Sequence, residues 1–196
     1  MNNTPEHQTK HPGWLKANIL GWLLGFVVVL VLSGSFDAMG IERLQFFLGV
    51  GMGAGVGFMQ WRVLRKSAGI GTRWIWYSVL GLGGAFLFFD VLKYFSGHSG
   101  SPYYILMSTA LGGLLAGMLQ YGLLKATLPN AGMWTRGSFS GWLLAVLTVL
   151  SLDYTKYVSS NNWVLFTLNI LLILAGGPVL GVVTGFFLKK ASTPIG

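Results

Sequence analysis

The stretch Gly53–Arg65, GAGVGFMQWRVLR, decides the fold because closely related letters occur twice more in the chain. Gly113–Lys125 reads GLLAGMLQYGLLK, and Gly177–Lys189 reads GPVLGVVTGFFLK. The shared pattern is G-x-x-x-G-x-x-[Q/T]-x-x-x-L-[K/R], with offsets of 60 and then 64 residues. Self-similarity at a nearly fixed period indicates a repeat architecture.

Each copy of the pattern follows an apolar segment that begins with tryptophan. Trp14, Trp74 and Trp134 are 60 residues apart. The repeating unit is therefore a helical hairpin, and the three repeats span about 13–69, 73–128 and 133–190. Because each unit crosses a membrane twice, all three share one orientation, which predicts a pseudo-threefold bundle around the membrane normal. A sequential up-and-down bundle without a ring is the alternative.

The composition is that of a membrane protein. Of the 196 residues, 53% are hydrophobic and only 9% are charged, whereas soluble domains carry about 25% charged residues. Six apolar segments are each about long enough for a bilayer core, which needs about 20 helical residues. They cover residues 14–32, 44–64, 74–92, 103–124, 134–152 and 163–188. We expect an all-α integral membrane protein, a six-transmembrane-helix bundle built from three parallel helical hairpins.

This bundle is expected to form one transmembrane domain, residues 13–196, preceded by a flexible cytoplasmic tail at residues 1–12. The first apolar segment ends at Ser33-Gly34-Ser35, a small-residue pattern that also occurs at signal-peptide cleavage sites. We expect a retained helix instead, because the segment belongs to the repeat.

The charges divide unequally between the two sides of the predicted bundle. One side receives ten basic residues and one acidic residue, and the other receives three basic and four acidic residues. This asymmetry predicts that both termini face the cytoplasm, as in a bacterial inner-membrane protein. It predicts contact with anionic lipids at the cytoplasmic face, and it explains the net charge of +8 without nucleic acid. The repeated tryptophans are expected in the interfacial aromatic belt.

The pattern of Gly53–Arg65, repeated with partner helices that begin with tryptophan, resembles a bacterial group of Gly-rich polytopic membrane proteins. The resemblance spans most of the chain. It implies a multi-pass helical protein, and it supplies no chemistry because the group has no assigned activity.

Small residues four apart predict close helix packing, since lipid provides no hydrophobic drive for helices to associate. The candidates for this packing role are Gly49, Gly53, Gly57, Gly113, Gly117, Gly177 and Gly181. Gly176-Gly177-Pro178 predicts a kink in the last helix, because proline removes a backbone donor. The kink either relieves an overlong helix or provides a hinge or unwound binding segment.

Several polar residues are candidates for binding a substrate or an ion. Asp90 and Asp153 each precede a lysine by three residues, a spacing that allows pairing on one helix face. The cluster is either an interfacial charge group or an outer vestibule with converging carboxylates. Gln60 and Gln120, near the inner ends of their helices, either form hydrogen bonds to a neighbouring helix or line a cytoplasmic mouth of the bundle. The full set is Asp37, Asp90, Lys93, Asp153, Lys156, Gln60 and Gln120.

The sequence disfavours an enzyme. It has no cysteine, three histidines, no metal-binding motif and no plausible Ser/His/Asp set at one membrane depth. We therefore predict no catalytic residue, metal or cofactor. Two functions are left: binding or facilitating passage of a small solute or ion, or a non-catalytic accessory role in a membrane complex or homo-oligomer. Glycine faces buried within one chain favour the first, and lipid-exposed glycine faces favour the second.

Overall fold

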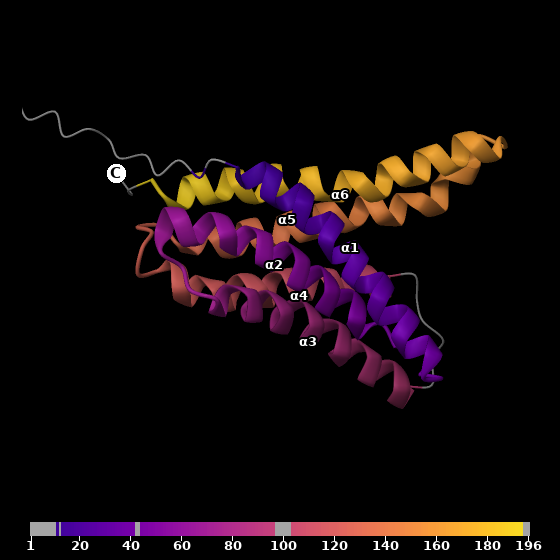
Figure 1. The fold of residues 1–196 in the computed structure, drawn as a ribbon, viewed down its shortest axis with the longest axis horizontal. Helices are drawn as coiled ribbons and strands as arrows, with labels where there is room; N and C mark the ends of the chain where they lie inside the picture. The colour runs from indigo at the N-terminus through magenta and orange to yellow at the C-terminus, as the bar shows by residue number, and fades with distance from the viewer. Residues whose placement is uncertain (1–10, 12, 42–43, 97–102, 194–196) are drawn as a thin grey trace, which may run out of the picture.

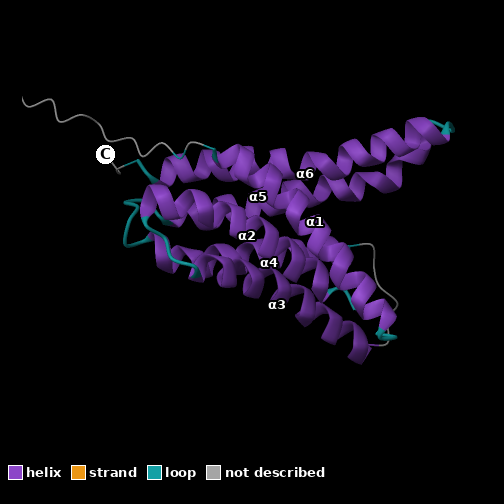
Figure 2. Ribbon diagram, in the orientation of Figure 1, coloured by secondary structure: helices purple, strands orange, loops and turns teal. Residues whose placement is uncertain are grey.

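The computed structural model describes residues 11, 13–41, 44–96 and 103–193, and all regular elements in these residues are helical (Figures 1 and 2). The helices are α1 (Trp14–Ala38), α2 (Phe46–Ala68), α3 (Arg73–Ser96), α4 (Tyr104–Leu124), α5 (Gly132–Leu150), the short 3-10 helix η1 (Ser151–Tyr157) and α6 (Asn162–Ala191). The helical fold class expected from the sequence is confirmed for these residues. Apart from His11, the expected tail at residues 1–12 lies outside the described residues.

Five helices are long and apolar enough to cross a membrane, namely α1, α3, α4, α5 together with η1, and α6. Their length and composition are compatible with membrane-spanning helices. The sixth, α2, does not meet that measure, because it contains five glycines and ends in polar and basic residues. The low hydropathy of α2 reflects glycines that are buried against its neighbours.

The six long helices form a closed ring in chain order. Each helix packs against the next one in the sequence, and α6 returns to pack against α1. One end of the ring, here called the tryptophan end, carries Trp14, Trp74 and Trp134 at the beginnings of α1, α3 and α5. The other end, here called the open end, is where these three helices finish.

Glycine allows the helices to approach closely. A methyl group at Gly53 would lie 2.7 Å from the Ser78 carbonyl oxygen of α3. One at Gly55 would overlap the backbone of Gly25 in α1. The seven glycines expected to pack are all buried between helices of this same chain. Their faces therefore do not point to the outside of the ring.

Two helices differ from the sequence prediction. α1 continues to Ala38, through residues expected to form a turn, and Ser35 Oγ donates to the Val31 carbonyl within it. α6 continues through Pro178, where an unwound segment was one expectation. Trp22 Nε1 of α1 donates to the Ile173 carbonyl at 2.8 Å, near this proline.

The ring widens toward the open end. The outer parts of α5 and α6 separate there from those of α1 and α3 (Figure 1). The hydrogen bonds described between α1 and α6 involve Trp14 and Trp22, both in the first half of α1. No residue of α6 between Asn162 and Ala175 is buried. The two ends of the bundle are therefore packed very differently.

Candidate functional site

The tryptophan end is closed by three indole rings that meet inside the ring. The centroids of Trp14 and Trp134 are 5.7 Å apart, and those of Trp74 and Trp134 are 5.3 Å apart. Their side chains are only 5%, 0% and 1% exposed for Trp14, Trp74 and Trp134. The expectation that they form an interfacial belt is wrong, because these residues face the bundle interior.

A polar layer lies directly beside these rings. Trp74 Nε1 donates to Gln60 Oε1 at 3.3 Å, and Gln60 Nε2 donates to Asn18 Oδ1 at 2.9 Å. One amide of α2 therefore joins α1 and α3. All three side chains are buried, so their hydrogen bonds satisfy groups that would otherwise be costly to desolvate.

The same arrangement recurs in the next hairpin. Trp134 Nε1 donates to Gln120 Oε1 at 2.9 Å, and Gln120 Nε2 donates to Ser78 Oγ at 2.8 Å. In the last hairpin, Thr184 Oγ1 accepts from Trp14 Nε1 at 3.0 Å. Each tryptophan thus donates to the polar residue of the preceding even-numbered helix. Both glutamines bridge helices, and neither lines an open mouth.

A cavity of about 280 Å³ lies between the helices on the open side of this layer. Residues of all six long helices line it. Three sets of lining residues occupy matching positions in the repeat pattern: Trp22, Leu82 and Trp142; Phe26, Phe86 and Val146; Gly49, Thr109 and Ile173. Thr109 is the one polar residue among those that line the cavity.

The cavity floor is aromatic. The rings of Trp22 and Trp142 have centroids 6.1 Å apart, and both residues are buried together with Leu82. Trp22 has its indole N–H occupied by the Ile173 carbonyl, so its ring presents carbon atoms to the cavity. The cavity therefore offers an apolar and aromatic surface to a bound molecule, with few hydrogen-bonding groups.

The three candidate carboxylates lie in different surroundings. Asp90 is buried, and its Oδ2 accepts from the backbone N–H groups of Gln45 and Phe46 at 2.8 and 2.7 Å. It therefore caps the beginning of α2. Asp37, in the last turn of α1, and Asp153, in η1, are exposed. The structure does not bring the three together, since the ends of α1 and η1 lie far apart (Figure 1).

The two candidate lysines contact aromatic rings. Lys93 Nζ lies 5.9 Å from the ring centroid of Tyr104, and Lys156 Nζ lies 5.2 Å from that of Tyr157. Within the described part of the chain, no ion pair joins either lysine to the aspartate three residues before it. This placement suits the interfacial-cluster alternative, in which lysine stems lie against apolar surface.

Sequence reasoning missed the cavity residues and the polar partners of the glutamines. The signal was present, since Trp22, Leu82 and Trp142 follow the same 60-residue spacing as the first tryptophans. That spacing predicts one layer but not whether the layer encloses space. Among the described residues, no group of three or more histidine, aspartate or glutamate side chains is placed to hold a metal.

Comparison with protein-family models, curated proteins and solved structures found no match to this chain.

Proposed function

We propose that this protein is a non-catalytic polytopic membrane protein that binds a small, largely apolar solute between its helices and facilitates its passage. The observation that carries the proposal is the apolar cavity of about 280 Å³, to which all six long helices contribute. Binding sites for small molecules are typically concave, mostly apolar and equipped with few polar groups. A cavity framed by Trp22, Trp142, Phe26 and Phe86 has that character.

The proposed host is a pseudo-threefold bundle of three parallel hairpins in the bacterial inner membrane. The recurring bonds from tryptophan to Gln60, Gln120 and Thr184 support this symmetry. In this arrangement α2 also crosses the membrane, because it lies between α1 and α3 and runs opposite to them. The basic residues gathered at the tryptophan end support a cytoplasmic location for that end and for both termini.

The surroundings of the candidate ion-binding residues favour a neutral solute over an ion. Asp90 Oδ2 already binds two backbone N–H groups, and the other two carboxylates lie at separate exposed positions. Transporters driven by ions usually carry an ionisable residue within the membrane. The cavity lining has none. We therefore narrow the proposed solute class to uncharged, apolar molecules.

Passage requires the tryptophan end to open. The cavity is separated from that end by the Trp22–Trp142 layer, by the hydrogen-bonded polar layer and by the three indoles that contact one another. The structure is thus closed toward the proposed cytoplasmic side. Release there requires the bonds of Gln60 and Gln120 to break together with the indole contacts.

Native mass spectrometry of a mild-detergent extract tests solute binding. We expect one apolar small molecule per chain, which organic extraction and chromatography would then identify. Val146→Phe fills the cavity at the position where the other repeats carry Phe26 and Phe86, and it should reduce occupancy at least fivefold. Val182→Phe, on an exposed part of α6, is the matched control and should retain the guest.

A second variant guards against misfolding. Val149 also lines the cavity, so Val149→Phe adds volume there too. Because Val149 is only partly buried, the larger side chain is easier to accommodate without loss of the fold. Loss of the guest in both variants with wild-type thermal stability supports the proposal. Wild-type chains without any bound molecule, or full occupancy in both cavity variants, would refute it.

The second candidate function is an accessory subunit of a larger membrane complex. The hairpin of α5 and α6 favours it, because its outer part separates from α1 and α3 (Figure 1). The first half of α6 also exposes large apolar residues. Trp163 is 80% exposed and Phe166 is 59% exposed. Co-purification of a stoichiometric partner chain, or of a second copy, which Trp163→Ala and Phe166→Ala together release, would favour this function. A lone chain that keeps its small molecule would favour solute binding.

A further inference from the structure

We propose that a groove between α1 and α2 at the tryptophan end holds the phosphate group of one anionic phospholipid. This basic groove is lined by Lys16, Arg62 and Lys66, together with apolar residues described below. It lies outside the ring interior, so the proposal does not rest on the solute cavity.

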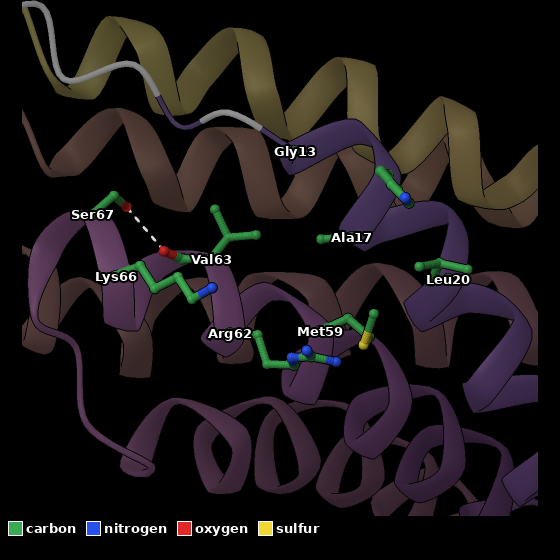
Figure 3. Close-up of a pocket in the computed structure, with 9 residues that line it drawn as sticks. Gly13, Ala17, Leu20, Met59, Arg62, Val63, Lys66 and Ser67 are labelled. Atoms are coloured by element: carbon green, nitrogen blue, oxygen red, sulfur yellow. Dashed lines mark hydrogen bonds between the residues drawn. The ribbon is translucent and has the colours of Figure 1, made fainter.

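The groove is a substantial pocket with cations on both sides. Its volume is about 580 Å³. Arg62 and Lys66 are four residues apart, which places them on one face of α2. Figure 3 shows their side chains along the space that separates α2 from Gly13, Ala17 and Leu20 of α1. Lys16 adds a third cation from α1. Guanidinium and ammonium groups together are well suited to bind phosphate oxygens.

These three cations have no partner among the described residues. No acidic residue lines the groove, and no hydrogen bond or ion pair joins the three to another described side chain. Two other basic residues at this end contact aromatic rings. Arg65 lies over the Trp61 ring at 5.3 Å, and Lys190 lies over the Phe186 ring at 4.5 Å. The basic groove brings three cations without an internal partner to one pocket, where they can meet an external anion.

The full set of three cations occurs in this hairpin alone. In the second hairpin, the positions that match Lys16, Arg62 and Lys66 at an offset of 60 are Trp76, Gly122 and Ala126. In the third hairpin the matching positions are Arg136, Phe186 and Lys190, and Lys190 lies over the Phe186 ring. A general need for basic helix ends would not concentrate three cations between one pair of helices. The difference between hairpins points to a specific contact of the first one.

Below the cations the groove is apolar, which distinguishes a lipid from a free anion. Ala17, Leu20, Met59 and Val63 continue the lining from the charged rim toward the middle of the bundle. Leu20 is exposed, so this lining faces the surroundings of the ring. A headgroup phosphate at the rim would place an acyl chain along these residues. Inorganic phosphate would leave them uncovered.

Titration of the delipidated full-length protein with phosphatidylglycerol, read by native mass spectrometry, tests the site. We expect one tightly bound lipid per chain and much weaker binding of phosphatidylcholine with the same acyl chains. The double variant Arg62→Gln/Lys66→Gln should weaken phosphatidylglycerol binding about twentyfold, since a cation near anionic lipid contributes about fivefold.

The control is Lys125→Gln/Lys189→Gln. It removes the same charge from exposed residues at the same end of the bundle, outside the groove. We expect it to change the affinity less than about threefold, because only the general attraction between a cation and an anionic lipid is altered. Equal losses in the two double variants would overturn the proposal, because binding would then follow net charge and not this groove. The melting temperatures of both variants establish that each is folded.

Competition with inorganic phosphate and with glycerol 3-phosphate forms the second part of the experiment. Neither should displace phosphatidylglycerol at millimolar concentration if the acyl chain contributes to binding. Displacement by either would overturn the assignment to a lipid and identify a soluble phosphate compound as the occupant. The additional variant Leu20→Asn should weaken phosphatidylglycerol binding severalfold, and unchanged lipid binding in this variant would also count against the lipid.

Discussion

The two ends of the bundle are packed differently although residues at matching positions of the repeat pattern line both. At the tryptophan end, three indoles, two glutamines and a threonine occupy the interior completely, and each indole N–H has a partner. At the open end, the matching layers of α1, α3 and α5 surround a cavity. Segments with a similar sequence pattern therefore form a filled layer at one end and enclose a cavity at the other, depending on whether their inward residues carry hydrogen-bonding groups.

The difference also has an energetic meaning. In a membrane, helices associate through close van der Waals contact and interhelical hydrogen bonds. The tryptophan end has both, and its buried polar groups specify how the helices fit together. The open end has apolar surface and few fixed partners. We expect substitutions at the tryptophan end to reduce stability strongly and substitutions at the open end to reduce it little.

The largest effect is expected where α1 and α2 meet most closely. In Gly55→Ala the new methyl group overlaps the Gly25 backbone and lies 2.7 Å from the Gly21 carbonyl oxygen. Because backbone atoms cannot move aside, the variant should lose about 3 kcal/mol of stability, at the upper end for overpacking. Thermal unfolding in detergent, followed by intrinsic fluorescence, measures the loss.

Gly84→Ala is the matched control for that substitution. Gly84 also lies within a helix, α3, but a methyl group there meets nothing within 4 Å. It should leave the stability unchanged or raise it by up to about 1 kcal/mol through helix propensity. Similar losses in the two variants would show that the close approach of α1 and α2 does not govern stability.

The next largest effect is expected in the polar layer. Gln120→Leu removes the acceptor of Trp134 Nε1 and the donor to Ser78 Oγ. The indole N–H left without a partner in a buried site should cost about 2 kcal/mol. Gln120→Thr imitates the third hairpin, where Thr184 accepts from Trp14, and should cost about half as much. If leucine is tolerated as well as threonine, the polar layer does not hold this end together.

Much of the helical architecture could be predicted from the sequence, because the length of the apolar segments and the spacing of the glycines are set by local requirements of helix length and helix packing. The spacing of 60 residues also identified Gln60 and Gln120 as equivalent. It did not show which way Trp14, Trp74 and Trp134 face. Tryptophan favours both membrane interfaces and buried sites where its N–H finds an acceptor, and only the position of the glutamines decides between them.

The candidate site was harder to predict for a physical reason. In an apolar sequence the rare charged residues, such as Asp90 and Asp153, are the ones that a sequence pattern predicts to bind a ligand. The cavity is instead lined by ordinary apolar residues such as Phe26 and Val146. Sequence patterns predict which residues share a layer, but the width of that layer depends on packing against several helices at once.

A smaller effect separates the two aspartates of the open end. Asp90→Asn weakens the cap of α2, because the carboxylate oxygen accepts from two backbone N–H groups. It should cost about 1 kcal/mol, as for other helix caps. Exposed Asp153→Asn should stay within about 0.5 kcal/mol of the wild type. Chemical or thermal unfolding of the two single variants compares them directly.

The double variant Asp90→Asn/Asp153→Asn then addresses function. If the apolar cavity is the binding site, uptake and retention of the solute should be unaffected once the stability difference is taken into account. A selective loss of uptake by a folded double variant would instead restore a binding role for these carboxylates. It would also contradict the assignment of the solute site to the apolar cavity.

The smallest effect concerns the contacts of His11 at the tryptophan end, here called the His11 clasp. His11 Nδ1 lies 2.8 Å from Ser67 Oγ, near the end of α2, and its Nε2 lies 3.4 Å from Ser192 Oγ, just beyond α6. Burial lowers the pKa of His11 from its ordinary value of 6.5. The folded protein therefore favours the neutral ring, whereas the unfolded chain binds the proton more tightly.

The sign of the pH effect follows from this difference in proton affinity. The contribution of His11 to stability should be fully present above about pH 6.5 and should be lost as the pH falls through the lowered pKa. Melting temperatures measured at pH 7.5 and pH 5.0 should differ by a few degrees more in the wild type than in His11→Asn, which has no titrating ring. If both proteins show the same pH dependence, the His11 clasp does not contribute to closure, and the tryptophan end is held by its buried indoles and amides alone.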